Sequence, residues 1–232
     1  MSIEKHIAIV LSAGKGTRMK SNIQKQYLLL REKPIIYYSL AELQKCPFID
    51  EIILVTGQEE IEYNRLEIVE RYGFTKVTNI VAGGKERYHS VYAGLKSIST
   101  CDYVYIHDGA RPFIDQEILS RIYEAVRADQ ACAVGMPVKD TIKISNHEGY
   151  AEHTPPRDLV WMIQTPQAFQ YDLIKRAYDK LIQKKVKGVT DDAMVIEYME
   201  KKKVKLVPGS YSNIKITTPE DLEIAELFCR NL

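Results

Sequence analysis

A glycine loop that directly follows an apolar run is the part of the chain best suited to chemistry. Residues 7–11 are apolar enough to form a buried strand, and Gly14 and Gly16 come directly after them. Glycines let the backbone turn tightly and bring its N–H groups against phosphate oxygens. Arg18 and Lys25 add positive charge close behind. We therefore expect this loop to bind the phosphates of a nucleoside triphosphate.

Two better-known glycine loops do not fit this sequence. The dinucleotide-binding fingerprint needs a third glycine at the start of the helix, but Thr17, Arg18 and Met19 follow Gly16. The phosphate loop of ATPases needs serine or threonine directly after its glycine–lysine pair, and here that position is Gly16. An ordinary surface turn uses glycines in the same way, so the loop alone leaves two interpretations open.

A glycine pair after a later apolar run forms a second candidate site. Gly83 and Gly84 permit the close approach of a planar base, and Lys85, Arg87 and Ser90 follow as hydrogen-bond donors. These residues predict a base pocket. The start of a helix would explain Ser90 equally well.

A carboxylate stands at the end of a further apolar run, residues 103–107. Mg²⁺ prefers one or two carboxylates plus substrate phosphates, so Asp108 alone suffices when a triphosphate supplies the other oxygens. We therefore predict that Asp108 binds the metal. The alternative is an Asp108–Arg111 ion pair that fixes the turn. We expect His107 to pack behind the site rather than to act as an acid or base.

The composition of the chain excludes several classes of protein. Its 232 residues fit one large α/β domain, which we expect to span residues 1–232. A net charge of +1 lacks the basic field that nucleic-acid binding needs. No apolar run is long enough for a membrane span or a signal peptide, and the four cysteines are too scattered for zinc. We expect a cytoplasmic protein without nucleic-acid or membrane partners.

Apolar strand patterns alternate with helical patterns, which predicts a Rossmann-like, mostly parallel sheet with helices on both faces. The predicted strands are residues 7–11, 51–56, 77–81, 103–107, 131–137 and 204–207. The predicted helices are residues 34–45, 59–72, 90–97, 116–128 (capped by Asp115), 171–184, 192–199 and 219–228 (capped by Thr218). Open sheets of this kind bind ligands where their parallel strands end, so we expect the candidate sites to converge there.

Residues 138–158 break this alternation and predict a protruding β-arm. Residues 141–145 alternate like a strand, residues 146–149 suit a turn, and residues 150–154 can return. A two-stranded ribbon is marginal in water, so we expect it to pack against its own domain or a second subunit. A mobile surface loop is the alternative.

Seven short blocks, in order along nearly the whole chain, resemble the 2-C-methyl-D-erythritol 4-phosphate cytidylyltransferase family. They are residues 12–19 with 25–27, 83–90, 107–112, 138–141, 164–167, 190–193 and 213–215. One block alone would be weak, but seven in order argue against chance.

This resemblance implies a nucleotidyltransferase-type fold and a reaction. The cytidylyl group of CTP would pass to 2-C-methyl-D-erythritol 4-phosphate, giving 4-diphosphocytidyl-2-C-methyl-D-erythritol and pyrophosphate in the non-mevalonate route to isoprenoids. Mg²⁺ or another divalent cation would be the cofactor. The resemblance also implies a homodimer in which the arm crosses into the neighbouring subunit.

The resemblance further implies roles for single residues. The residues that stabilise charge on the reacting phosphates would be Arg18, Lys25 and Lys215. The nucleotide would contact Ser12, Ala13, Gly14, Gly84, Lys85, Arg87, Ser90 and Ala110. The polyol phosphate would contact Arg111, Thr141, Arg157, Thr165 and Thr190, and Asp108 would hold the metal.

Three other functions stay open. A ribitol 5-phosphate cytidylyltransferase resembles the chain in fold and triphosphate loop, although residues 107–111, 139–141 and 190–193 favour the methylerythritol acceptor. A sugar-1-phosphate nucleotidyltransferase is a weaker match. A nucleotide-binding regulator without turnover would share the fold, but four intact residues argue against it: Arg18, Lys25, Asp108 and Lys215.

Overall fold

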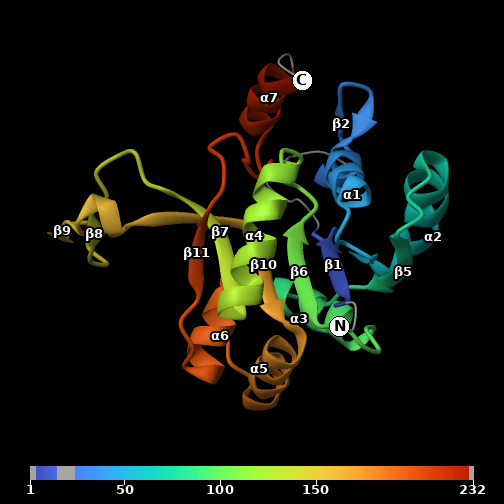
Figure 1. Ribbon diagram of the computed structural model, residues 1–232. Helices are drawn as coiled ribbons and strands as arrows, with labels where there is room; N and C mark the ends of the chain where they lie inside the picture. The colour runs from blue at the N-terminus through green and yellow to red at the C-terminus, as the bar shows by residue number, and fades with distance from the viewer. Residues whose placement is uncertain (1–3, 15–23, 230–232) are drawn as a thin grey trace.

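A seven-stranded sheet lies at the centre of the computed structural model, which describes residues 4–14 and 24–229 (Figure 1). The strand order is β11-β7-β10-β6-β1-β4-β5, and only β10 runs antiparallel to its neighbours. The strands are β1 (His6–Leu11), β4 (Glu51–Thr56), β5 (Val77–Ala82), β6 (Tyr103–Asp108), β7 (Ala131–Pro137), β10 (Trp161–Gln170) and β11 (Lys205–Pro208). The predicted mostly parallel sheet is confirmed.

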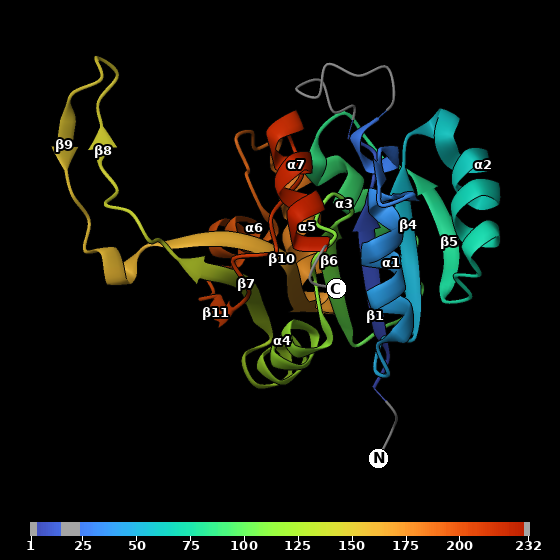
Figure 2. The same cartoon turned by 90° about the horizontal axis from the view of Figure 1, so that it is seen from above.

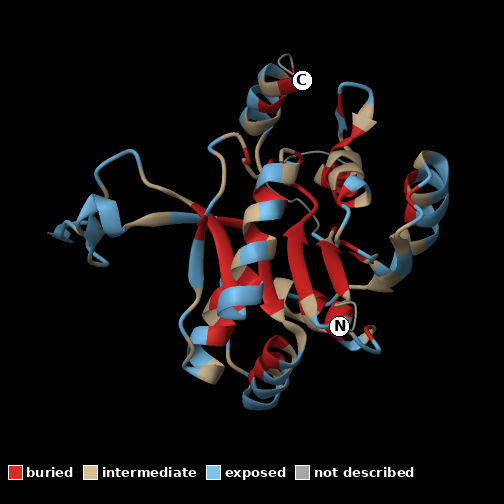
Figure 3. Cartoon of the chain, in the orientation of Figure 1, coloured by how far each residue is buried: buried red, intermediate tan, exposed pale blue. Residues whose placement is uncertain are grey.

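Helices cover both faces of the sheet because side chains alternate along each strand. In β1, Ala8 and Val10 face one core, and Ile7 and Ile9 face the other. The first core is closed by α1 (Ile35–Lys45), η4 (Asn64–Glu70) and α4 (Gln116–Asp129). The second is closed by α3 (Arg87–Lys96), α5 (Tyr171–Lys184) and α6 (Asp192–Glu200). The central strands are almost entirely buried (Figure 3).

A smaller third core lies at the end of the chain. It joins α7 (Pro219–Phe228) to the short hairpin of β2 (Leu29–Leu30) and β3 (Lys33–Pro34) through Leu30, Ile216 and Ala225. Thr218 caps α7 by accepting a hydrogen bond from the backbone of Asp221, as its sequence predicts. Within the described residues, no helix combines the length and the apolar character needed to cross a bilayer.

The single helix predicted over residues 59–72 is divided into three helical elements. A 3₁₀ turn, η3 (Gln58–Glu60), leads into α2 (Ile61–Tyr63) and then into η4, which has π-helical hydrogen bonding. Buried Asn64 lies at the start of η4, where its amide donates to the carbonyl of Glu60 and to the hydroxyls of Tyr27 and Thr56. Helical character was predicted, but not this division.

No sequence pattern predicts β10, the strand that lies between β6 and β7. It carries Gln164, Thr165 and Gln167, which are buried although they are polar. Pro166 interrupts the run, and the register against β7 shifts between Ile163 and Gln167. A buried strand is normally recognised by its apolar residues, so this one reads as a loop.

The predicted arm is present and projects away from the sheet (Figures 1 and 2). Its paired strands, β8 (Ile144–Ser145) and β9 (Ala151–His153), are shorter than expected. Between them, the Asn146 side chain accepts hydrogen bonds from the backbone of Glu148 and Tyr150 at 3.1 and 3.0 Å. The arm leaves and rejoins the body between β7 and β10.

An aromatic cluster holds a buried histidine at the amino end of β1. The His6 ring is 2% exposed and stacks on Tyr103, and its Nδ1 lies 2.9 Å from the Tyr105 hydroxyl. Burial lowers the pKa of His6 from 6.5. The folded protein therefore favours the neutral form of this ring more than the unfolded chain does.

We expect His6 to make the free energy of unfolding decrease as the pH is lowered below 6.5. Below pH 6.5 the unfolded chain protonates His6 more readily than the folded chain, so its contribution is present above that pH and is lost as pH falls. The loss approaches about 1.4 kcal/mol per pH unit for this proton. Urea unfolding between pH 7.5 and 5 should show a shallower pH slope in His6→Asn than in the wild type. Equal slopes would contradict the assignment.

Candidate active site

Two neighbouring cavities open at the carboxyl end of the parallel strands. The chain proceeds from β1 to β4 and β5 on one side, and then returns to place β6 on the other side of β1. The loops after β1 and β6 therefore run in opposite directions. The crevice between two such loops is where open α/β sheets bind ligands. Leu11, the last residue of β1, pairs with Asp108, the last residue of β6.

The first cavity, of about 500 Å³, collects the residues predicted to bind nucleotide. Its lining includes Ser12, Ala13, Gly14, Gly84, Lys85, Arg87, Ser90 and Ala110, together with Lys25, Asp108 and Lys215. Gln26 lines it too, and its amide donates to the Ser12 carbonyl at 2.5 Å. Arg18, predicted to stabilise phosphate charge, lies outside the described residues.

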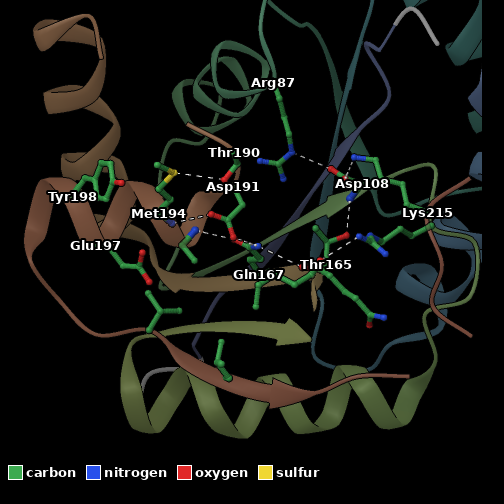
Figure 4. Close-up of a pocket in the computed structure, with 16 residues that line it drawn as sticks. Arg87, Asp108, Thr165, Gln167, Thr190, Asp191, Met194, Glu197, Tyr198 and Lys215 are labelled. Atoms are coloured by element: carbon green, nitrogen blue, oxygen red, sulfur yellow. Dashed lines mark hydrogen bonds and ion pairs between the residues drawn. The ribbon is translucent and has the colours of Figure 1, made fainter. Parts of the chain in front are cut away.

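The second cavity, of about 560 Å³, contains three of the residues predicted to bind the polyol phosphate (Figure 4). They are Arg111, Thr165 and Thr190. The cavity continues along α6 and β11, where Met194, Glu197, Tyr198, Val204 and Leu206 line it.

Arg87, Asp108 and Lys215 line both cavities and so form a shared wall. Asp108 Oδ1 lies 3.1 Å from Arg87 Nε, and its Oδ2 lies 2.6 Å from Lys215 Nζ. Burial by itself would raise the pKa of Asp108, but the two cations hold that pKa well below its usual range. The wall is thus an ionised carboxylate between two cations.

A buried carboxylate anchors Arg87 from behind. Both oxygens of Asp192 accept from the Arg87 guanidinium, at 3.0 and 2.8 Å, and the Tyr178 hydroxyl donates to Asp192 at 2.5 Å. Asp192 is fully buried. All three guanidinium nitrogens of Arg87 therefore donate to carboxylates. This arrangement suits a residue that holds Asp108 in position. A direct contact between Arg87 and a base stays a prediction.

Close packing explains the glycine pair after β5. A Cβ on Gly83 would lie 2.6 Å from Cβ of Ala13, and one on Gly84 would lie 2.4 Å from Cβ of His89. The hydroxyl of Ser90 accepts from the Gly84 N–H at 3.1 Å. A larger residue at position 83 would collide with the loop after β1, and one at position 84 would collide with His89 of α3, so the pair is needed with or without a base.

Arg111 does not form the ion pair with Asp108 that the sequence left as an alternative. Its Nη1 donates to the Asn213 carbonyl at 2.7 Å. The residues that pair with Asp108 are Arg87 and Lys215. The carboxylate is therefore held by partners distant in sequence rather than by its own turn.

The described residues offer a metal one carboxylate at this wall. They contain no cluster of three or more His, Cys, Asp or Glu side chains arranged to hold an ion. Asp108 alone fits Mg²⁺ only if phosphate oxygens supply most other ligands, which is how Mg²⁺ usually binds nucleotides. The donor set thus fits a metal that arrives with its nucleotide.

Thr141 and Arg157, both predicted to bind the polyol phosphate, lie on the arm and line neither cavity. Both are exposed, and Arg157 Nη1 donates to the Lys139 carbonyl at 3.3 Å. One chain therefore does not bring them to the other site residues.

Two residues with clear roles in the site were not predicted from the sequence. Asp192 fixes Arg87, as described above. Gln167 donates to Asp191 at 2.9 Å and accepts from the backbone N–H of Ala193 at 2.9 Å, which places the start of α6 against the second cavity. Both lie inside blocks that carry the family resemblance, which was the available signal.

Comparison with known proteins gives one consistent family. A family model described as 2-C-methyl-D-erythritol 4-phosphate cytidylyltransferase matches residues 6–231. Proteins of that name from Lachnospira eligens and Lachnoclostridium phytofermentans are 54% and 49% identical, over 96% and 98% of this chain and 98% and 97% of their own lengths.

Solved structures agree. The 4-diphosphocytidyl-2C-methyl-D-erythritol synthase of Anaerococcus prevotii superposes with a TM-score of 0.87 at 35% identity, covering 98% of this chain and 96% of that one. The 2-C-methyl-D-erythritol 4-phosphate cytidylyltransferase of Francisella tularensis gives a TM-score of 0.79 at 29% identity, covering 97% and 99%.

We expect Asp192→Asn to destabilise the protein and to lower its activity. Removing one charge of a buried pair leaves the other uncompensated, which costs about 3 kcal/mol at the low end of such changes. The low end applies because the Arg87 side chain is 27% exposed and keeps Asp108 as a partner. Urea unfolding at neutral pH measures the loss.

Glu67→Gln is the matched control, because it removes an exposed pair with Arg71 within one helix. The free energy of unfolding of that variant should fall by less than about 0.5 kcal/mol. Equal losses in the two variants would show that the Arg87–Asp192 pair does not anchor the wall.

Proposed function

The chain belongs to the 2-C-methyl-D-erythritol 4-phosphate cytidylyltransferase family, and from this membership we propose the reaction that it catalyses. The cytidylyl group of CTP passes to the phosphate of 2-C-methyl-D-erythritol 4-phosphate, and pyrophosphate leaves. The product, 4-diphosphocytidyl-2-C-methyl-D-erythritol, belongs to the non-mevalonate route to isoprenoids.

The shared wall of Arg87, Asp108 and Lys215 is the observation that supports this reaction best. Two polyanionic substrates must meet at one point for a phosphate oxygen to reach the α-phosphorus. Cavities of about 500 and 560 Å³ that meet at a wall containing two cations suit a nucleotide on one side and a phosphorylated acceptor on the other.

The mechanism needs no covalent enzyme intermediate. An acceptor phosphate oxygen attacks the α-phosphorus of CTP, the bond from that phosphorus to the bridging oxygen breaks, and pyrophosphate departs with the electron pair. The acceptor oxygen is already ionised, so positioning and neutralisation of charge carry the catalysis. Lys215 and Lys25 line the nucleotide cavity and suit the neutralisation of phosphate charge. Arg18 is proposed for the same role.

Asp108 is the residue proposed to hold Mg²⁺. A bound Mg²⁺ would neutralise charge on the nucleotide phosphates. The Arg87 guanidinium, held by Asp192, keeps the Asp108 carboxylate ionised and oriented toward both cavities.

We expect pyrophosphate release only when CTP and 2-C-methyl-D-erythritol 4-phosphate are both present with Mg²⁺. The assay supplies ribitol 5-phosphate as the competing acceptor, and ATP, GTP and UTP as competing donors. Turnover with ribitol 5-phosphate instead would overturn the proposed acceptor. Tight CTP binding without turnover on either acceptor would indicate a nucleotide-binding regulator.

We also propose a homodimer in which the arm completes the neighbouring subunit's site. Thr141 and Arg157 are exposed in one chain, and the arm and its base also expose the apolar side chains of Tyr150 and Leu159, at 71% and 74%. A two-stranded ribbon is marginal in water and gains stability by packing on another surface. Arg157 suits bidentate binding of a phosphate.

The location of the protein in the cytoplasm stays a prediction.

Complementation between inactive subunits tests the shared site. Lys25→Ala and Arg157→Ala should each lower turnover about 10²–10³-fold, as loss of one transition-state donor does. In the mixed dimer, purified through two tags after co-expression, one of the two sites holds both native residues. We expect it to recover about half of the wild-type activity, because two-fold symmetry pairs each body with the other arm.

A mixed dimer of Lys25→Ala with Lys215→Ala is the control. Both residues line the same cavity of one body, so neither site in that dimer is complete and no recovery is expected. If the Lys25→Ala and Arg157→Ala mixture stays as inactive as the control, the arm does not act across subunits.

A further inference from the structure

A short turn brings Lys25 to the nucleotide cavity. This is the 3₁₀ turn η2 (Lys25–Tyr27), in which Lys25 and Gln26 both line the cavity. Three residues complete one turn of a 3₁₀ helix, so its successive side chains point about 120° apart. The third side chain, that of Tyr27, lines neither cavity. It therefore serves the site only through the turn that it belongs to.

The Tyr27 side chain is held at the end of β4. Its hydroxyl donates to Glu60 Oε2 at 3.1 Å and accepts from the Asn64 amide at 2.6 Å. Thr56, the last residue of β4, donates to the same Glu60 oxygen at 3.1 Å. The Tyr27 ring packs edge-on against Tyr63, with the ring centroids 5.0 Å apart. Both the hydroxyl and the ring thus attach Tyr27 to one neighbouring segment.

That segment lies outside both cavities. Asn64 begins the π-helical element η4, is fully buried, and also donates to the Glu60 carbonyl at 2.8 Å. Single π-helical turns are rare and are frequent near functional sites. The preceding helix α2 lies beside β5 at the edge of the sheet (Figure 2). The inward turn of Asn64 thus places its amide on the Tyr27 hydroxyl.

Gln26 attaches the same turn to the loop after β1. Its side chain is 1% exposed, and its amide donates to the Ser12 carbonyl at 2.5 Å. Behind the turn, the Leu28 carbonyl accepts from the N–H of Ile35 at 3.0 Å. A turn of three residues with two anchored side chains has little room to rotate. The direction of the third side chain, that of Lys25, follows from the two anchors.

We propose that Tyr27 is a positioning residue for Lys25. The contacts of its hydroxyl with Glu60 and Asn64 set the orientation of η2, and with it the place of the Lys25 ammonium group at the nucleotide cavity. The proposal rests on the proposed function, in which Lys25 neutralises phosphate charge. A displacement of about 1 Å in such a group can lower the rate about 10²-fold. Residues at the edge of the sheet thereby influence catalysis without touching a substrate.

A double-mutant cycle on kcat tests the proposal. Tyr27→Phe removes only the hydroxyl, and Glu60 keeps its bond from Thr56, so we expect the variant to fold. In the wild-type background, Tyr27→Phe should lower kcat about tenfold. In the Lys25→Ala background, the same substitution should change kcat less than about twofold, because the group that it positions is gone. A hydroxyl that only stabilised the fold would have the same effect in both backgrounds.

Tyr171→Phe is the matched control. Its hydroxyl also takes part in two hydrogen bonds, with the carbonyls of Leu95 and Ile98 at 3.0 and 3.1 Å, and Tyr171 lines neither cavity. We expect its kcat to stay within about twofold of the wild type. In Tyr27→Phe, the KM for the acceptor should also stay within about twofold, because η2 lines only the nucleotide cavity.

The outcomes separate this inference from the proposed function. With an active wild type, three results would overturn the inference alone: an unchanged kcat in Tyr27→Phe, equal losses in the two backgrounds, or a matching loss in Tyr171→Phe. If the wild type uses ribitol 5-phosphate, the proposed acceptor is wrong, and the same cycle with that acceptor decides the inference. A wild type that transfers the cytidylyl group to neither acceptor would overturn both.

Discussion

The rest of the site depends on an ionised carboxylate, Asp108, that is held between Arg87 and Lys215 away from bulk water. Burying a carboxylate is costly unless cations and hydrogen bonds compensate it. That compensation comes from α3 and from the segment after β11, while Asp192 on α6 fixes the guanidinium. The body of the protein must bring these segments together for the wall to form, which ties the fold to the chemistry.

The antiparallel strand β10 gives the second cavity its polar lining. Because it runs against β6, it enters the sheet at the edge where the parallel strands end. Thr165 and Gln167 therefore lie beside Asp108 and the start of α6, where their side chains meet backbone N–H groups and carboxylates.

The polar residues around the wall are organised mainly by one another. Asn213 donates to the Thr165 carbonyl at 3.0 Å, and Arg111 donates to the Asn213 carbonyl at 2.7 Å. His107 links Thr165 to the Arg111 carbonyl. These hydrogen bonds hold the members of the network against one another, although Arg111 Nε and Asn213 Oδ1 are buried without a hydrogen-bond partner among the described residues.

The sequence by itself determined the parts of the protein that depend on local patterns. Periodic apolar residues gave the parallel strands and most helices, glycines marked the loops, and the order of strands and loops predicted that Asp108 and Gly84 would converge. Only the tertiary structure decided β10, where Gln164, Thr165 and Gln167 are buried although polar because they line the second cavity rather than a core. It also decided the partners of Arg87, since Asp192 lies 105 residues away, and those of Thr165, 58 residues from His107. Contacts of that range leave no periodic signal, because the chain's fold and not its local spacing brings the two atoms together.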